Sequence, residues 1–173
     1  MKIVKLNEIA VCNKDNFDFS NVKGVINYLD TSSITDNSVS SFTKYENYKN
    51  IPSRAKRAVS NGTIVYSNVR PILRHIGILS NLPQNVVVST GFTTIDVNEQ
   101  KIDPYYLYYV LSQDCYTQYL SKIANSAVSA YPSITVSDLS NLKLTIFEDL
   151  SYQKKLGQLL KDIDKKIQNN KKQ

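Results

Sequence analysis

Turn signals separate four short runs of strand-forming residues between residues 61 and 97. The first of these turn signals is Asn61-Gly62, a dipeptide typical of tight hairpin turns. The runs that follow are rich in β-branched and aromatic residues, which favour strands. They cover residues 63–67, 76–79, 86–89 and 93–97. The middle of the chain is therefore predicted to be β-rich.

Helices are predicted around this centre. Asp103-Pro104 favours a helix start, because Asp is a good N-cap and Pro suits the first helical position. An apolar stripe then continues to about Ala124. A short basic helical turn is expected at residues 54–58, with Ser53 as its cap. The prediction is an α+β domain over about residues 1–148, followed by a protruding coiled-coil-type helix over 149–173.

This last helix has one narrow apolar stripe and lysines on its other faces. The stripe consists of Leu156, Leu159, Leu160, Ile163 and Ile167. At 1.5 Å per residue the helix is about 28 Å long. Such a helix is marginal alone. Its stripe is therefore expected to pack either on its own domain or on another chain.

Length and composition place the chain in a broad class. Its 173 residues, 42% hydrophobic and 21% charged, suit one domain with a packed core. No apolar run approaches the roughly 18–20 residues of a membrane span, and the start lacks the apolar stretch of a signal peptide. We therefore expect no membrane association, a cytoplasmic location and two reduced cysteines, Cys12 and Cys115.

The net charge of +6 is unevenly distributed. Residues 40–80 carry seven Lys and Arg, including all four arginines of the chain, against a single Glu. Arginine suits phosphate and base-edge contacts because its planar fork donates two parallel hydrogen bonds. Basic residues interleaved with aromatic ones favour nucleic-acid binding. The alternative is a scattered, solvated surface.

Two enzymatic patterns are incomplete. Residues 103–106 (Asp-Pro-Tyr-Tyr) are similar to the Asp-Pro-Pro-Tyr motif of amino-group DNA methyltransferases, but the second Pro is Tyr and no glycine-rich turn for adenosylmethionine precedes them. The carboxylates Asp96, Glu99 and Asp103 lie beside a lysine, as in magnesium nucleases, without the usual Glu-x-Lys spacing. His75 has no recognisable catalytic partner. No catalytic or metal-binding residue is assigned.

Several short segments occur in a characteristic order. The clearest is Gly-Thr-Ile-Val-Tyr-Ser-Asn-Val-Arg-Pro at residues 62–71. The others cover residues 28–34, 52–57, 89–92, 103–108, 129–132, 137–139 and the helical region 152–167. Their joint order resembles the target-recognition domain and spacer helix of type I restriction-modification specificity subunits. Ser129-Ala130 departs from this pattern, because a glycine commonly precedes the Tyr-Pro pair.

The resemblance implies a specificity subunit that reads a split site in double-stranded DNA and is not itself an enzyme. Adenosylmethionine, ATP and Mg²⁺ would belong to separate methyltransferase and restriction (motor) subunits, and this chain would hold no cofactor. The alternatives are a small DNA-modifying enzyme or a regulatory protein that pairs through its helix. The residues expected at the DNA face are Lys44, Arg54, Lys56, Arg57, Arg70, Arg74 and Tyr131.

A complete specificity subunit has two recognition domains and two spacer helices, whereas this sequence has one of each. The resemblance therefore implies a half-subunit. Two copies would restore the whole by antiparallel pairing of their C-terminal helices, with the apolar stripe as the contact. Two-fold symmetry would then make the DNA target palindromic.

Overall fold

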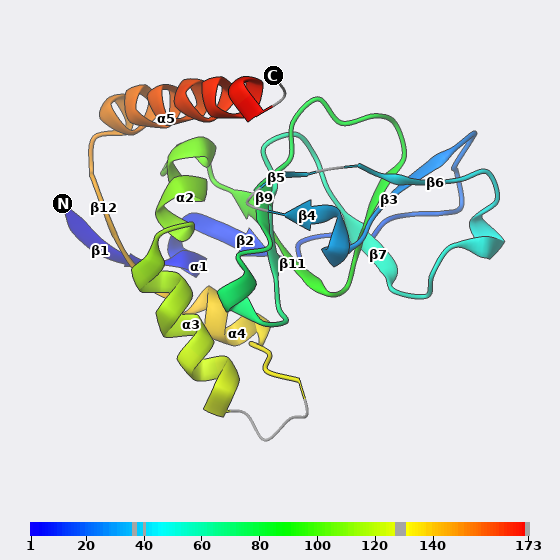
Figure 1. Cartoon of the computed structure of the whole chain (residues 1–173), viewed down its shortest axis with the longest axis horizontal. Helices are drawn as coiled ribbons and strands as arrows, with labels where there is room; N and C mark the ends of the chain where they lie inside the picture. Colours follow the sequence, from blue (N-terminus) through cyan, green and yellow to red (C-terminus); the bar gives the residue numbers. More distant parts are fainter. Residues whose placement is uncertain (36–37, 40, 127–130, 172–173) are drawn as a thin grey trace.

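The computed structural model describes residues 1–35, 38–39, 41–126 and 131–171 (Figure 1). The strands are β1 (Lys2–Lys5), β2 (Ala10–Cys12), β3 (Ile26–Leu29), β4 (Ile34–Thr35), β5 (Ser38–Val39), β6 (Thr43–Tyr45), β7 (Ala55–Ala58), β8 (Ile64–Ser67), β9 (Ile76–Ile78), β10 (Val86–Ser89), β11 (Phe92–Val97) and β12 (Lys143–Ile146). The helices are α1 (Leu6–Ile9), α2 (Pro104–Leu111), α3 (Asp114–Ser126), α4 (Val136–Ser140) and α5 (Leu150–Lys171), with 3-10 turns η1 (Thr31–Ser33), η2 (Tyr48–Asn50) and η3 (Pro71–Leu73). The predicted α+β class is confirmed.

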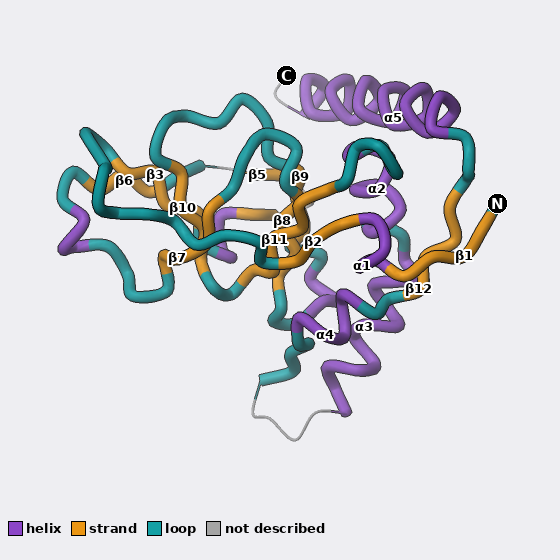
Figure 2. The backbone as a smooth tube through the Cα atoms, turned by 180° about the vertical axis from the view of Figure 1, so that it is seen from behind, coloured by secondary structure: helices purple, strands orange, loops and turns teal. Residues whose placement is uncertain are grey.

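Two four-stranded sheets form the β-rich part. The first has the order β6-β3-β10-β7, in which β3 and β10 are parallel. The second has the order β2-β11-β8-β9 and is antiparallel throughout. An apolar layer containing Leu29 and Val88 of the first sheet and Val65 and Phe92 of the second joins them. Figure 2 shows the first sheet at one end of the molecule and the helices at the other.

The larger core lies between the second sheet and the helices. Ile64 and Ile95 of the sheet share one buried cluster with Leu107 and Leu111 of α2 and Leu120 of α3. Strands β1 and β12 add a small antiparallel pair at the edge of this helical end, with Lys2 opposite Ile146 and Lys5 opposite Lys143. The helical end is therefore tied together by segments from both ends of the domain.

Residues 54–58 were predicted to be helical, and this prediction is wrong. Ala55–Ala58 is strand β7, which pairs with β10 on one side. On its other side, the Phe17 N–H donates to the Lys56 carbonyl at 2.8 Å and the Ala58 N–H donates to the Asp15 carbonyl at 3.1 Å. A helical turn would break these hydrogen bonds on both sides of the strand. Non-local pairing therefore outweighs the local preference.

The predicted helix from residue 103 to 124 is two helices. Asp103 caps α2 as expected, since its Oδ1 accepts the Tyr106 N–H at 2.8 Å. The helix ends at Leu111, and the hydroxyl of the following residue, Ser112, donates to the Tyr108 carbonyl at 2.8 Å. A second helix, α3, begins at Asp114, where a carboxylate favours a helix N-terminus. The apolar pattern alone did not reveal this break.

Other expectations concern the whole chain. Cys12 and Cys115 are free thiols, as predicted. Within the described residues, no helix is both long and apolar enough to cross a bilayer.

Asp96 in β11 gives a pH-dependent prediction. Its Oδ1 accepts the Thr63 hydroxyl at 2.8 Å, and burial raises the pKa of its carboxyl. The folded chain therefore holds this proton more tightly than the unfolded chain, so stability falls as pH rises from about 4 through the folded pKa. Asp96→Asn, which keeps an oxygen acceptor for Thr63, is expected to raise the free energy of unfolding at pH 7.

Urea unfolding at neutral and acidic pH checks this prediction. The gain should disappear below about pH 4, where the carboxyl is protonated in both states. Glu99→Gln, on the exposed turn after β11, is the control and should change little at either pH. An equal gain at both pH values would contradict the burial argument.

Candidate nucleic-acid interface

Three loop segments are joined around Asn68. The Asn68 N–H donates to the Gly91 carbonyl, and the Ile134 N–H donates to the Asn68 carbonyl, both at 2.9 Å. The Arg70 N–H donates to the Pro132 carbonyl, also at 2.9 Å. These bonds hold residues 68–74, 89–91 and 131–133 in one surface. Together with residues 53–54, which adjoin it, we call this surface the loop face.

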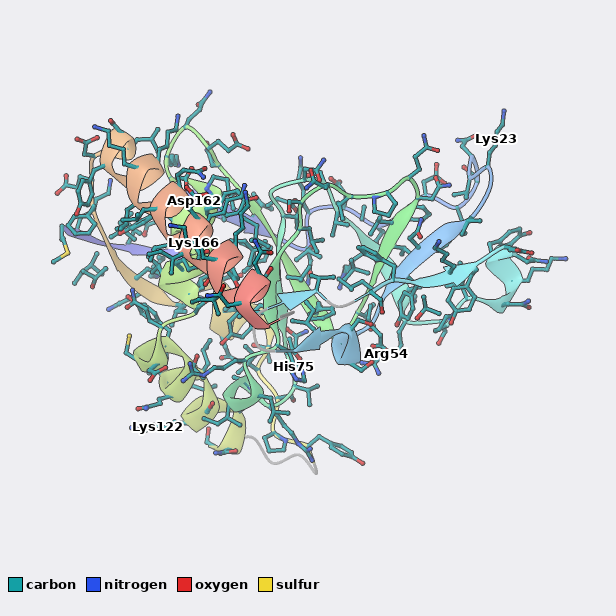
Figure 3. All side chains as sticks on the ribbon, turned by 45° about the horizontal axis from the view of Figure 1, so that its top comes forward. Lys23, Arg54, His75, Lys122, Asp162 and Lys166 are labelled. Atoms are coloured by element: carbon teal, nitrogen blue, oxygen red, sulfur yellow. The ribbon has the colours of Figure 1, made fainter. Side chains whose placement is uncertain are left out.

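Arg54 reaches the loop face beside Gly91. The Thr90 N–H donates to the Arg54 carbonyl at 2.8 Å. A Cβ on Gly91 would lie 2.6 Å from Nη2 of Arg54 and 2.9 Å from the Thr31 side chain. The lack of a side chain at Gly91 therefore leaves the space that the guanidinium occupies. Figure 3 labels Arg54 and, nearer α3, His75.

Two arginines flank the η3 turn on the same face. Arg70 and Arg74 have φ values of 48° and 52°, a left-handed conformation that is uncommon outside glycine. The turn is held by hydrogen bonds from the Leu73 N–H to the Arg70 carbonyl and from the Arg74 N–H to the Pro71 carbonyl, both at 2.9 Å. Non-glycine residues in this conformation cost free energy and cluster at functional sites.

The arginines differ in their partners. The Arg74 guanidinium forms an ion pair with the Asp114 carboxylate at the start of α3. Arg57 donates from Nη1 to Asn16 Oδ1 at 3.1 Å, and its buried Nε has no partner among the described residues. By contrast, the exposed guanidinium groups of Arg54 and Arg70 form no hydrogen bond or ion pair with any described residue. Their donors are free for a ligand.

The seven predicted DNA-binding residues do not form one cluster. Arg54, Arg70 and Arg74 lie on the loop face with Tyr131, which is 65% exposed. Lys44 is in edge strand β6, whereas Lys56 and Arg57 are in the opposite edge strand, β7. With two strands between them, these edges are about 14 Å apart at the usual strand spacing. Any common ligand must therefore span an extended surface.

Sequence reasoning did not assign Asn68 or Gly91 to the site. Asn68 joins the loop segments through its main chain, and its Oδ1 accepts the Thr93 hydroxyl at 2.7 Å. Gly91 makes room for Arg54. The position of Gly91 in a tight connection between two predicted strands could have marked it as a special residue. Its contact with Arg54, 37 positions earlier, could not be predicted without the fold.

The apolar stripe of α5 divides between two environments. Leu156 packs against the larger core and Leu160 is half-buried, whereas Leu159, Ile163 and Ile167 are 56%, 44% and 48% exposed. The exposed three form a ridge, here called the α5 ridge, about a quarter turn from the face that lies on α2. The helix therefore packs on its own domain and still presents apolar surface.

Two of the three acidic residues weighed for catalysis have structural roles, and the third, Glu99, is exposed on the turn after β11. Asp103 caps α2, and Asp96 accepts the Thr63 hydroxyl. Across the part of the chain that is described, no group of three His, Cys, Asp or Glu side chains could hold a metal ion. The loop face itself presents the hydrogen-bond donors and positive charges of Arg54, Arg70 and Arg74.

Comparison with known proteins agrees with this kind of surface. All of residues 1–173 match the family model described as the type I restriction modification DNA specificity domain. The chain belongs to this family. A curated member, the type I restriction enzyme HindI specificity subunit of Haemophilus influenzae, is 32% identical over 154 residues, which are 89% of this chain and 33% of that protein. This specificity domain therefore spans about a third of that subunit.

Solved structures share the fold of this specificity domain. The HsdS subunit from Thermoanaerobacter tengcongensis matches with a TM-score of 0.80 at 22% identity over 99% of this chain and 44% of that one. A chain from a study of complex assembly and conformational transition of the type I R-M system has a TM-score of 0.77 at 21% identity, covering 98% and 44%. The S subunit from M. genitalium has a TM-score of 0.62 at 16% sequence identity, over 99% of this chain and 41% of that one.

Proposed function

We propose that this chain is a sequence-specific reader of double-stranded DNA, a specificity half-subunit without catalytic activity of its own. The match of its whole length to the DNA specificity domain family carries the proposal. In this role it directs methyltransferase and restriction subunits to a split target. Adenosylmethionine, ATP and Mg²⁺ are used by those subunits.

The loop face is the proposed DNA contact. Arg54 and Arg70 have free guanidinium groups and suit base edges or phosphates. Arg74, already paired with Asp114, and Tyr131 complete the centre of the contact. The two strand edges, with Lys44 on one and Lys56 and Arg57 on the other, serve as outlying phosphate contacts that raise affinity without specificity.

The chain divides functionally into residues 1–148, which recognise DNA, and the spacer helix at 149–173. Two copies pair antiparallel through the α5 ridge, and a two-fold axis relates their loop faces. The exposure of Leu159, Ile163 and Ile167 supports this pairing, since it leaves apolar surface uncovered. The target of such a pair is a split palindrome.

Selection of random duplex DNA tests the proposal. The purified protein is incubated with the pool at low and moderate salt, alone and with its methyltransferase subunit, and bound DNA is sequenced. An enriched split palindrome is the expected result. A single enriched half-site would retain DNA recognition and contradict pairing. No enrichment under either condition, with the protein folded, would contradict recognition itself.

A further inference from the structure

Polar contacts hold helix α5 against the rest of the domain, in addition to the apolar packing of Leu156. Gln153 is fully buried, although glutamine is usually exposed. Its Oε1 accepts the Asp103 N–H at 3.0 Å, and its Nε2 donates to the Phe147 carbonyl at 2.6 Å. One side chain therefore joins α5 to the start of α2 and to the segment after β12. Buried polar groups tolerate little displacement, because an unpaired one costs about 1–3 kcal/mol.

One turn later, Gly157 brings the two helices into close contact. A Cβ at this position would lie 2.5 Å from Oδ1 of Asp103 and 2.9 Å from the Tyr106 nitrogen. Those two atoms form the N-cap hydrogen bond of α2. The backbone of α5 therefore rests against the cap of α2, which fixes the distance between the two helices.

Further along the helix, two contacts determine its direction. The Tyr109 hydroxyl donates to Oδ2 of Asp164 at 2.6 Å, and Nζ of Lys161 lies 3.9 Å from the centre of the Tyr105 ring. Burial and the neighbouring Asp164 raise the pKa of Tyr109, so its hydroxyl keeps the proton that it donates. Both contacts again join α5 to α2.

Beyond these contacts the helix is not closely packed. A cavity of about 340 Å³ separates Lys161, Asp164 and Gln168 of α5 from Phe42, Leu79 and their neighbours in the β-rich part. Apolar packing therefore does not determine the angle of the C-terminal half of α5. The hydrogen bond between Tyr109 and Asp164 lies at the edge of this space, which both residues line.

We propose that Gln153, Gly157 and the pair of Tyr109 with Asp164 are positioning residues that set the gap between the two halves of the DNA target. This rests on the proposed function, in which two copies pair through the α5 ridge. In such a pair, the angle and position of α5 on α2 determine the separation of the two loop faces. Since one base pair spans about 3.4 Å, a displacement of this size changes the preferred gap by one base pair.

Matched substitutions in the full-length chain test this role. Gln153→Met and Tyr109→Phe together remove three hydrogen bonds, two of Gln153 and one of Tyr109, and nearly preserve side-chain volume. Gln158→Met and Tyr119→Phe are the controls, because Gln158 lies on an exposed side of α5, like Asp162 and Lys166 in Figure 3, and Tyr119 is 53% exposed on α3. The primary measurement is the distribution of gap lengths in the selected DNA.

The wild-type protein and the control are expected to prefer one gap length. The Gln153→Met/Tyr109→Phe protein should select the same half-site sequence, while its preference for that gap over a gap one base pair longer or shorter falls at least tenfold. Lower stability alone would reduce the yield of bound DNA without altering the gap. Gly157→Ala, which displaces the helix, should shift the preferred gap.

A distance measurement without DNA provides a second readout. Nitroxide labels are placed on Cys115, which is exposed on α3, and on Asn169→Cys in α5, with Cys12→Ser in every protein. The labelled protein is diluted with unlabelled protein, so that distances within one copy dominate. Electron–electron double resonance should then give one narrow distance for the wild-type background and a broader distribution for the Gln153→Met/Tyr109→Phe protein. An unchanged distance distribution in the Gln153→Met/Tyr109→Phe protein would overturn the proposal, as would an unchanged gap preference.

The DNA selection also distinguishes a failure of this positioning role from a failure of the proposed DNA-recognition function. A wild-type pool with a split palindrome, and the same gap preference in the double variant, rejects the positioning role and retains the function. A wild-type pool with a single half-site rejects pairing, and the positioning role with it. A wild-type pool without enrichment, even with the methyltransferase subunit, rejects DNA recognition regardless of the variants.

Discussion

Replacing both Arg54 and Arg70 by alanine should weaken binding to the selected DNA at least thirtyfold. Both guanidinium groups are exposed on the loop face and form no hydrogen bond or ion pair with a described residue, so their removal leaves no buried partner unsatisfied. An arginine bound bidentately to a base contributes about 1–3 kcal/mol, and two therefore contribute about 2–6 kcal/mol. Since about 1.4 kcal/mol corresponds to a tenfold change, the loss is at least roughly thirtyfold.

A titration of labelled duplex at several salt concentrations measures this effect. The slope of log affinity against log salt should also become shallower, because fewer counterions are released. Lys5→Ala with Lys143→Ala is the charge-matched control, since these exposed residues face each other in β1 and β12, away from the loop face. If the control loses as much affinity as the arginine variant, net charge and not the loop face governs binding.

Loss of the α5 ridge should convert a paired protein into a monomer. Replacing Leu159, Ile163 and Ile167 with glutamine removes apolar surface that is already 44–56% exposed in the single chain. Glutamine is a good helix former, so the helix and the free energy of unfolding should change little. Burying each aliphatic side chain contributes about 1.5–3 kcal/mol, so the dissociation constant of the pair should rise more than a hundredfold.

Sedimentation equilibrium measures this dissociation constant. Gln158→Ala with Asp162→Ala changes the polar side of the same helix and should leave pairing intact. The ridge variant should also select single half-sites in place of a split palindrome. If the glutamine variant still pairs, the contact between the copies lies elsewhere on the chain. A wild-type protein that is monomeric at every concentration would contradict pairing altogether.

Much of the fold was predictable where the signal was local. Asn61-Gly62 marks a turn in which Gly62 has a φ of 92°, and Asp103 caps its helix. Local signals were misleading at β7, where they predicted a helical turn. This segment is a strand because it pairs with two distant segments, which bury Ala55 and leave Lys56 exposed. A four-residue basic run contains too little pattern to separate a helical turn from such a strand.

The candidate site was predictable in chemistry but not in arrangement. Arg54, Arg70 and Arg74 were identified from charge and residue type, and the fold places them on one face with Tyr131. Lys44 lies on a different strand edge, which charge along a sequence does not reveal. The same limit applied to α5, because a hydrophobic pattern identifies Leu159 and Ile163 but not the buried face, where Gln153 and Asp164 make polar contacts.

The pairing of β1 with β12 brings the first and last strands of the domain together at one place, here called the seam. The chain begins the domain at Lys2–Lys5 and leaves it at Lys143–Ile146, and these segments lie side by side just before α5 starts. The part between them meets the rest of the chain at two neighbouring backbone junctions, so it can be exchanged as one piece if the incoming α2 keeps the residues that contact α5. Gene rearrangements that cross at this seam would graft a different reading surface onto an unchanged helix. Under the proposed function, such an exchange would change the DNA target while the C-terminal helix stays the same.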